Sequence, residues 1–270
     1  MLSLQTEALK DAARRDYFLP VFVFLVVFAW LALWLWEQSP YGRYINHGLW
    51  TQYGLAADLC RVIPNGEVLL PAFLYVGGWM LMTTAMMLPA VIPLLLIFRR
   101  LTMRRADTSL LLALVIAGYL LAWGIFGVAA HGVSWIILET IRGNVWLTFN
   151  SWVPGALILF TAGVFQFSAL KYRCLDKCRT PMIFITQHWR GRNERSQSFL
   201  LGIHHGVYCV GCCWALMLLM FAVGTGSVGW MLALGAVMAV EKNMPWGQKM
   251  SVPLGVFLLA WSGSIVSLNM

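Results

Sequence analysis

The segment from residue 204 to 220, HHGVYCVGCCWALMLLM, holds the densest group of possible metal ligands in the sequence. Its candidate ligands are His205, Cys209, Cys212, Cys213 and Met217. On an α-helix, which turns about 100° per residue, His205, Cys209 and Cys212 fall within about 60° of one another. Cys213 widens the arc to about 100°, and Met217 lies one turn beyond Cys213, just outside the arc. One helix face therefore presents imidazole and thiols, which are ligands that Cu(I) or Zn(II) prefers.

A second pair of thiols, Cys174 and Cys178, lies in a basic segment that we expect to form a loop at residues 171–197. Three residues separate the two cysteines, so on a short helix they would lie one turn apart on the same face. Neighbouring cations favour the thiolate form, which is the form that binds metal. The same segment contributes His188. We expect these residues to approach the 204–220 segment and to form one site with it. The alternative is a pair of unrelated thiols kept reduced in the cytosol.

Methionines near the end of the second apolar segment add possible thioether ligands. On a helix, Met80 and Met87 share one face, and Met82 and Met86 share nearly the opposite face, so only one pair is expected to face the interior of a bundle. We include Met86 and Met87 among the candidate ligands. Neutral, soft thioethers select Cu(I) over harder ions, which makes copper the expected ion and zinc the second choice. Methionine and cysteine also fill gaps between helices, so plain packing is the alternative explanation.

The elements that must position these residues are apolar segments of membrane-spanning length. The chain is 60% hydrophobic and only 11% charged, which predicts an all-α, polytopic transmembrane helix bundle rather than a nucleic-acid-binding protein. We expect about seven spans, at residues 17–36, 68–98, 109–130, 153–170, 198–222, 227–241 and 251–268. The second is long enough to bend at Pro89 and Pro93. Residues 131–152 are expected to lie at the membrane interface instead of crossing it.

The distribution of basic residues predicts the orientation of these spans. Of the 19 lysines and arginines, all except Arg43, Arg61 and Arg142 fall in segments on one side of the predicted membrane. Because basic loops stay inside, the N-terminus is expected in the cytoplasm and the C-terminus outside. Glu241 and Lys242, which end the sixth span, are expected to pair with each other or with the basic segment. We divide the chain into residues 1–66, with a cytoplasmic segment, the first span and an outer loop, and a metal-binding membrane domain at 67–270.

Several short motifs resemble a bacterial family of predicted metal-binding integral membrane proteins of unknown function. They are WMLMTTAMMLP at 79–89, CLDKCR at 174–179, HW at 188–189, HGVYCVGCCWALM at 205–217 and EKNMPWG at 241–247. The resemblance extends over residues 70–268, and the YCVGCCW motif is its most specific part. It implies a multi-pass fold and metal binding, and it implies no settled activity.

The leading functional hypothesis is an integral membrane protein that binds a soft metal ion and hands it on, by transport or by delivery to a membrane metalloenzyme or metal chaperone. In this hypothesis the thiol pair of the basic segment accepts or releases the ion, and the cysteines of the 204–220 segment hold it centrally. The first alternative is a membrane thiol–disulfide oxidoreductase that uses Cys209 and Cys212. The second is a structural subunit of a membrane metalloenzyme. An enzymatic activity is not favoured, and we assign no catalytic residue.

Overall fold

The computed structural model describes residues 18–38, 69–103, 105, 107–150, 152–191, 193–223 and 228–269. Within these ranges every regular element is a helix, which confirms the predicted all-α class. The elements are α2 (Phe18–Gln38), α4 (Leu69–Met86), η3 (Leu88–Val91), α5 (Ile92–Thr102), α6 (Thr108–Gly143), α7 (Val145–Phe149), α8 (Trp152–Phe165), α9 (Ala169–Arg179), α10 (Pro181–His188), α11 (Glu194–Val223), α12 (Val228–Asn243), η4 (Gly247–Met250) and α13 (Ser251–Asn269). The predicted N-terminal cytoplasmic segment and the predicted outer loop lie outside the described residues.

Four stretches of helix are long and apolar enough to cross a membrane: Phe18–Gln38, Thr108–Val133, Glu194–Met220 and Gly247–Asn269. Two bent pairs of helices raise this number to six if each pair counts as one span. The pairs are Val76–Met86 with Leu88–Thr102, bent by 47°, and Trp152–Phe165 with Ala169–Arg179, bent by 64°. The described helices thus supply four to six candidate spans. The predicted sixth span corresponds to α12, which has only 16 residues.

Prolines explain where the second apolar segment bends. α4 ends at Met86, and Pro89 is the second residue of the short 3₁₀ turn η3 that leads into α5. Proline lacks an amide hydrogen and its ring clashes with the preceding turn, so a helix cannot pass through it undistorted. The predicted bend is therefore confirmed. The bend also affects the methionines, because helical spacing assigns residues to faces only as far as the helix continues. Met82, Met86 and Met87 are all buried. Met80 is only half-buried, so Met82 with Met86 is the one pair that is buried as a whole, and Met87 is buried beyond the end of α4.

Two other boundaries differ from the prediction. The basic segment is not a loop, because it forms α9 and α10 before α11 begins at Glu194. The side chain of Ser168 caps α9 by accepting a hydrogen bond from the amide of Lys171 at 3.1 Å. In addition, α6 does not end near residue 130 but continues to Gly143. This stretch contains no proline, and Gly132 alone costs a helix only about 1 kcal/mol, which is too little to end it.

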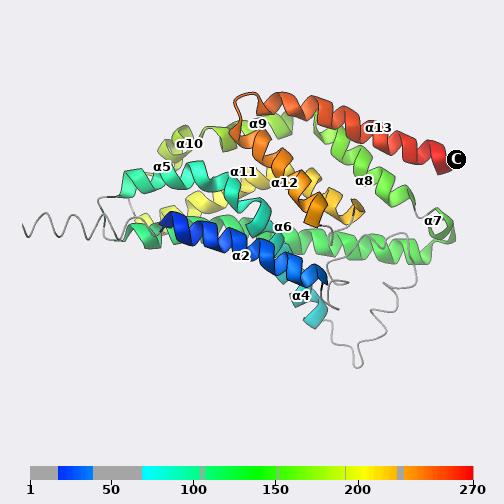
Figure 1. The fold of residues 1–270 in the computed structure, drawn as a ribbon, viewed down its shortest axis with the longest axis horizontal. Coiled ribbons are helices and arrows are strands. Elements are labelled where there is room, and N and C mark those ends of the chain that lie inside the picture. Colours follow the sequence, from blue (N-terminus) through cyan, green and yellow to red (C-terminus); the bar gives the residue numbers. More distant parts are fainter. Residues whose placement is uncertain are drawn as a thin grey trace, which may run out of the picture.

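The centre of the fold is the contact between α6 and α11, which lie side by side (Figure 1). Three glycines allow their backbones to touch. A Cβ on Gly118 would lie 2.1 Å from the carbonyl oxygen of Phe199, and one on Gly202 would lie 2.0 Å from that of Val115. Gly206 follows one turn after Gly202, and a Cβ there would lie 2.7 Å from the Cβ of Ala122. Small residues at this spacing bring helices close together in membranes. The contact fixes the register in which α6 faces the cysteines of α11.

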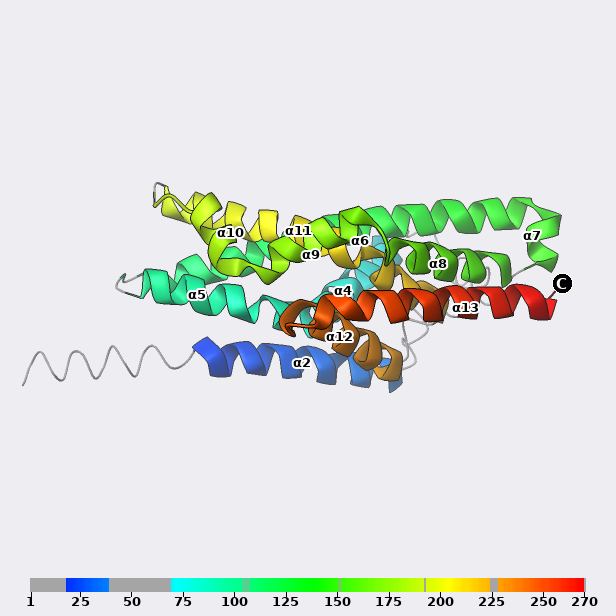
Figure 2. The same cartoon turned by 90° about the horizontal axis from the view of Figure 1, so that it is seen from above.

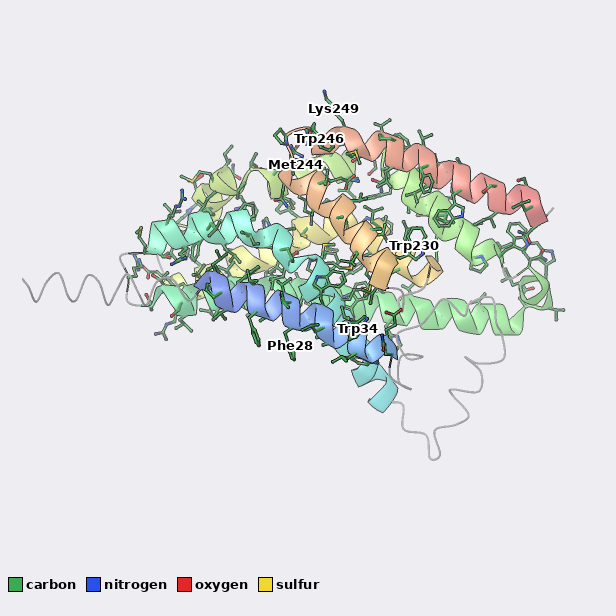
Figure 3. The ribbon with its side chains drawn as sticks, in the orientation of Figure 1. Phe28, Trp34, Trp230, Met244, Trp246 and Lys249 are labelled. Atoms are coloured by element: carbon green, nitrogen blue, oxygen red, sulfur yellow. The ribbon has the colours of Figure 1, made fainter. Side chains whose placement is uncertain are left out.

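The remaining helices surround this pair. α13 packs along α8, α9 packs on α11, and α2 packs on α4 at the edge of the bundle (Figure 2). The outer surface is apolar: Phe28 and Trp34 on α2 and Trp230 on α12 are 57%, 47% and 41% exposed (Figure 3). Soluble proteins rarely leave so many large apolar side chains uncovered. The surface has the character expected of helices in contact with lipid.

Candidate metal centre

Thiols from α9 and α11 meet inside the bundle. The Sγ atom of Cys178 lies 4.0 Å from that of Cys212, and the Sγ atoms of Cys212 and Cys213 lie 3.4 Å apart. The thiol of Cys212 also donates a hydrogen bond to the backbone carbonyl of Cys209 at 3.1 Å. Cys209, Cys212 and Cys213 are each 1% exposed, whereas Cys178 is only half-buried. We call these four residues the thiol cluster. The expected approach of the two cysteine-containing segments is thus observed.

Cys174 is close to the same face of α11, one helical turn before Cys178. A Cβ on Gly211 would lie 2.7 Å from the Sγ atom of Cys174, closer than real atoms pack. Glycine at this position therefore lets α9 approach the backbone of α11 between Cys209 and Cys212. The predicted arrangement of Cys174 and Cys178 on one face of a short helix is present, because both lie on α9 and both face α11.

Two polar residues that the sequence did not suggest as partners surround Cys209. The Nζ atom of Lys242 on α12 lies 2.8 Å from the Sγ atom of Cys209, and the hydroxyl of Tyr119 on α6 lies 3.0 Å from it. The same Nζ atom is 3.7 Å from the Sδ atom of Met87, and the hydroxyl of Tyr119 donates to the carbonyl of Met87 at 3.2 Å. A buried ammonium beside a sulfur stabilises the thiolate form. Met87 therefore lies beside the thiol cluster with a cation as its neighbour, and its role as a metal ligand stays a prediction.

The spacing of the sulfurs limits what this arrangement can hold. With metal–sulfur bonds of about 2.3 Å, two sulfurs on one ion lie about 4.6 Å apart in a linear site and about 4.0 Å apart in a trigonal one. The separation of Cys178 and Cys212 matches the trigonal value, whereas that of Cys212 and Cys213 is too short for either. Among the residues that the structure describes, no group of three or more His, Cys, Asp or Glu side chains is arranged to hold a metal ion. Binding would require side chains to rotate.

The remaining candidate ligands are the methionines Met86 and Met217 and the imidazole of His188. Met86 packs 3.6 Å from the Cβ position of Gly235 on α12, and Met217 is fully buried on α11. No hydrogen-bond contact found in the described ranges links either methionine to a thiol, so their ligand roles stay predictions. His188 stacks on Phe184 and on His204, with ring centroids 4.3 Å and 5.0 Å apart. This places His188 near the start of α11.

His205 connects these two regions. It is 3% exposed and lies between the ring of Phe184, with centroids 5.3 Å apart, and the ring of Tyr119, with centroids 6.0 Å apart. Its Nδ1 atom is buried and has no hydrogen-bond partner among the described residues. A buried nitrogen without a partner loses its interaction with water and is commonly explained by a ligand or an ion. This nitrogen fits the predicted role of His205 as a metal ligand.

A buried ion pair holds α9 against α12 beside the thiol cluster. The Nζ atom of Lys171 lies 2.6 Å from Glu241 Oε1, and the two side chains are 0% and 1% exposed. Gln166 accepts a hydrogen bond from the same ammonium, and Ser251 donates to the same carboxylate oxygen at 2.8 Å. The expected pairing of Glu241 with the basic segment is confirmed. Lys242, the next residue, instead points to Cys209.

Comparison with known proteins connects this site to copper. The family model described as PpoB2, copper chaperone, matches residues 76–265. No curated protein and no solved structure matches the chain. The matched range extends from α4 to α13 and includes every cysteine of the thiol cluster, its lysine and the buried ion pair. Because the match covers well over half of the sequence, the chain belongs to the PpoB2 copper chaperone family.

Proposed function

We propose that this chain is an integral membrane protein that binds one Cu(I) ion at the thiol cluster and hands it on to a partner. The observation that carries the proposal is the convergence of thiols from two helices, with Cys178 and Cys212 at a separation of 4.0 Å, in a member of a copper chaperone family. Soft thiolates are the ligands that Cu(I) prefers. The copper ion is the cargo of this site.

The charges around the cluster support a monovalent ion. Two thiolates and one Cu(I) ion carry a single negative charge, and the ammonium of Lys242, 2.8 Å from the sulfur of Cys209, neutralises it. A buried site with no net charge avoids the large cost of leaving an ion uncompensated in a medium of low dielectric constant. With Zn(II) and two thiolates the same site would carry a net positive charge. For two thiolate ligands, with any third ligand neutral, the balance of charge therefore favours Cu(I) over Zn(II).

Handing on the ion requires a ligand that a partner can reach. Cys178 is half-buried on the short helix α9, whereas Cys209, Cys212 and Cys213 are fully buried. A thiol of an incoming metal chaperone or membrane metalloenzyme would replace Cys178 first and then take the ion from the inner thiols. Because Cu(I) accepts two or three ligands, such an exchange can proceed stepwise without releasing the free ion.

We also propose that the protein lies in the bacterial plasma membrane with its N-terminus in the cytoplasm. The four to six helices of spanning length and the exposed apolar side chains of α2 support a location in the membrane. The bias of lysine and arginine supports the orientation. The start of α11 and the helix α10 lie at the opposite end of the bundle from the C-terminal end of α13, as this orientation requires (Figures 1 and 2). The count of seven spans belongs to this proposal.

A thiol–disulfide oxidoreductase is the second candidate, with a different pair from the one predicted. All five described cysteines are free. Cys212 donates a hydrogen bond from its thiol to the carbonyl of Cys209 at 3.1 Å, so it points along its own helix. The pair best placed to form a bridge is Cys178 with Cys212, which join α9 to α11. A small rotation of either side chain would bring these sulfurs to bonding distance.

Copper titration of the purified full-length protein separates the two functions. We expect the reduced protein, kept anaerobic, to take up about one equivalent of Cu(I) from a chromophoric chelator. Loss of a first ligand should lower the affinity at least about tenfold in Cys178→Ala and in Cys212→Ala, given that even outer-shell changes cost about 10–100-fold. Cys60→Ala removes a thiol outside residues 76–265 and should change nothing. A metal-free protein in which Cys178 and Cys212 are disulfide-bonded in membranes would overturn the copper proposal.

A further inference from the structure

Two imidazoles form a pair outside the thiol cluster, where the end of α10 meets the third turn of α11. The rings of His188, at the end of α10, and His204, on α11, have centroids 5.0 Å apart and planes inclined by 55°. His204 is exposed and His188 is half-buried, so the pair lies at the outer surface of the helix bundle. Two imidazole nitrogens at bonds of about 2.0–2.1 Å can share one metal ion at this ring separation with a small change in side-chain rotation.

One hydrogen bond prepares His188 for metal binding. Its Nδ1 atom lies 2.9 Å from the carbonyl oxygen of Phe184. A carbonyl only accepts, so Nδ1 must donate, and in the neutral ring Nε2 then carries the free lone pair. Histidines that bind metals usually donate their other nitrogen to a carbonyl or carboxylate in this way, which fixes the orientation of the ring. The stacking of His188 on Phe184, with centroids 4.3 Å apart, holds the ring further in place.

A continuous row of side chains leads from this pair to the thiols. Phe184 is fully buried and contacts both His188 and His205, whose centroids lie 4.3 Å and 5.3 Å from its own. The buried Nδ1 atom of His205 has no hydrogen-bond partner among the described residues. On the far side of His205 lies Tyr119, whose hydroxyl is 3.0 Å from the Sγ atom of Cys209.

We propose that His188 and His204 form a separate two-imidazole site that receives the copper ion from solution or from a donor and passes it by way of His205 to Cys209. This inference rests on the proposed function of the thiol cluster. Each step is an exchange of ligands on Cu(I), with no change in oxidation state. Thiolates bind Cu(I) more strongly than neutral imidazoles do, so movement towards the cluster is favourable. The site therefore determines how fast the cluster is loaded, and the cluster determines how much copper is held.

The test measures the rate of loading and the final occupancy separately. Anaerobic full-length protein is mixed with Cu(I) bound to a weak chromophoric chelator, and the near-ultraviolet absorption of the copper–thiolate bond is followed in a stopped-flow instrument. We expect His204→Gln and His188→Gln to slow loading by about 10–100-fold, the usual effect of disturbing a metal site, with the final occupancy unchanged. His131→Gln on α6 is the matched control, because His131 lies further along α6 than the part that packs on the histidine-bearing turns of α11. That part includes Ala122, nine residues before His131, which packs against Gly206. The control should load as fast as the wild type.

A second variant detects the imidazole site directly. A full-length protein with serine at all four positions of the thiol cluster should still bind about one Cu(I) ion through nitrogen ligands, as seen by X-ray absorption, and should lose it when His204→Gln is added. Loading at the wild-type rate in both histidine variants would overturn the inference and leave the proposed function intact. Absence of the copper–thiolate band in the wild type would overturn the proposed function itself. In that case the all-serine variant would still decide whether the histidines bind copper.

Discussion

The buried ion pair between Lys171 and Glu241 allows the fold to be tested quantitatively. Substitution of Glu241 by Gln keeps the size of the side chain and its ability to accept the hydrogen bond from Ser251. It removes the negative charge that lies 2.6 Å from the ammonium of Lys171. That ammonium is 0% exposed, so water cannot replace the lost partner. The remaining acceptor, Gln166, is neutral.

The structure indicates the size of the effect. Removing one partner of a buried ion pair usually costs about 3–5 kcal/mol, because an uncompensated charge stays buried, and we expect Glu241→Gln to fall in this range. Replacing both partners by apolar residues, as in Lys171→Met combined with Glu241→Leu, leaves no buried charge and is expected to cost less than Glu241→Gln alone. A double variant more stable than a single one is the signature of charge burial, and loss of packing alone would not produce it.

The assay is unfolding of the purified protein in mixed micelles with increasing sodium dodecyl sulfate, followed by far-ultraviolet circular dichroism. The exposed pair Arg105–Glu194 is the matched control, because its side chains are 43% and 20% exposed. Glu194→Gln should change the unfolding free energy by no more than about 1 kcal/mol, as exposed pairs usually do. If Glu241→Gln and Glu194→Gln have the same small effect, the argument from burial is wrong and water must reach Lys171.

Three further predictions concern the site, the helix contact and the topology. Lys242→Met removes the ammonium that neutralises the proposed copper–thiolate site and should weaken Cu(I) binding at least about tenfold in a chelator competition, whereas Lys249→Met should not, since one charge contact is worth about 1.4 kcal/mol or more. Gly206→Leu should destabilise the protein by about 1–3 kcal/mol in the micelle assay, because its Cβ would meet Ala122 at 2.7 Å; an unchanged midpoint would contradict the close contact of α6 with α11. A reporter fused to the C-terminus should be external and one inserted at 190–193 cytoplasmic; the reverse pattern would refute the proposed orientation.

Local features of the chain were predictable from its sequence. Apolar segments of sufficient length predicted most of the helices, because a chain must satisfy its own backbone hydrogen bonds when no water is present. Pro89 predicted the bend between α4 and α5 for an equally local reason. Helical spacing alone placed His205, Cys209 and Cys212 on one face, and Cys174 and Cys178 one turn apart. In each case the relevant residues are neighbours in the chain.

The identity of the partners across helices was decided by the tertiary structure. Tyr119 and Cys209 are 90 positions apart in sequence, and Lys242 is 33 positions from Cys209. Helical spacing assigns a residue to a face of its own helix, but it does not tell which helix lies opposite or in what register. The glycine contacts between α6 and α11 set that register, and the pairing of Lys171 with Glu241 brings α12, with Lys242, against α9. The sequence therefore determined which helices carry the thiols, whereas the packing of α6, α9, α11 and α12 decided that a buried cation and a phenol stand beside them.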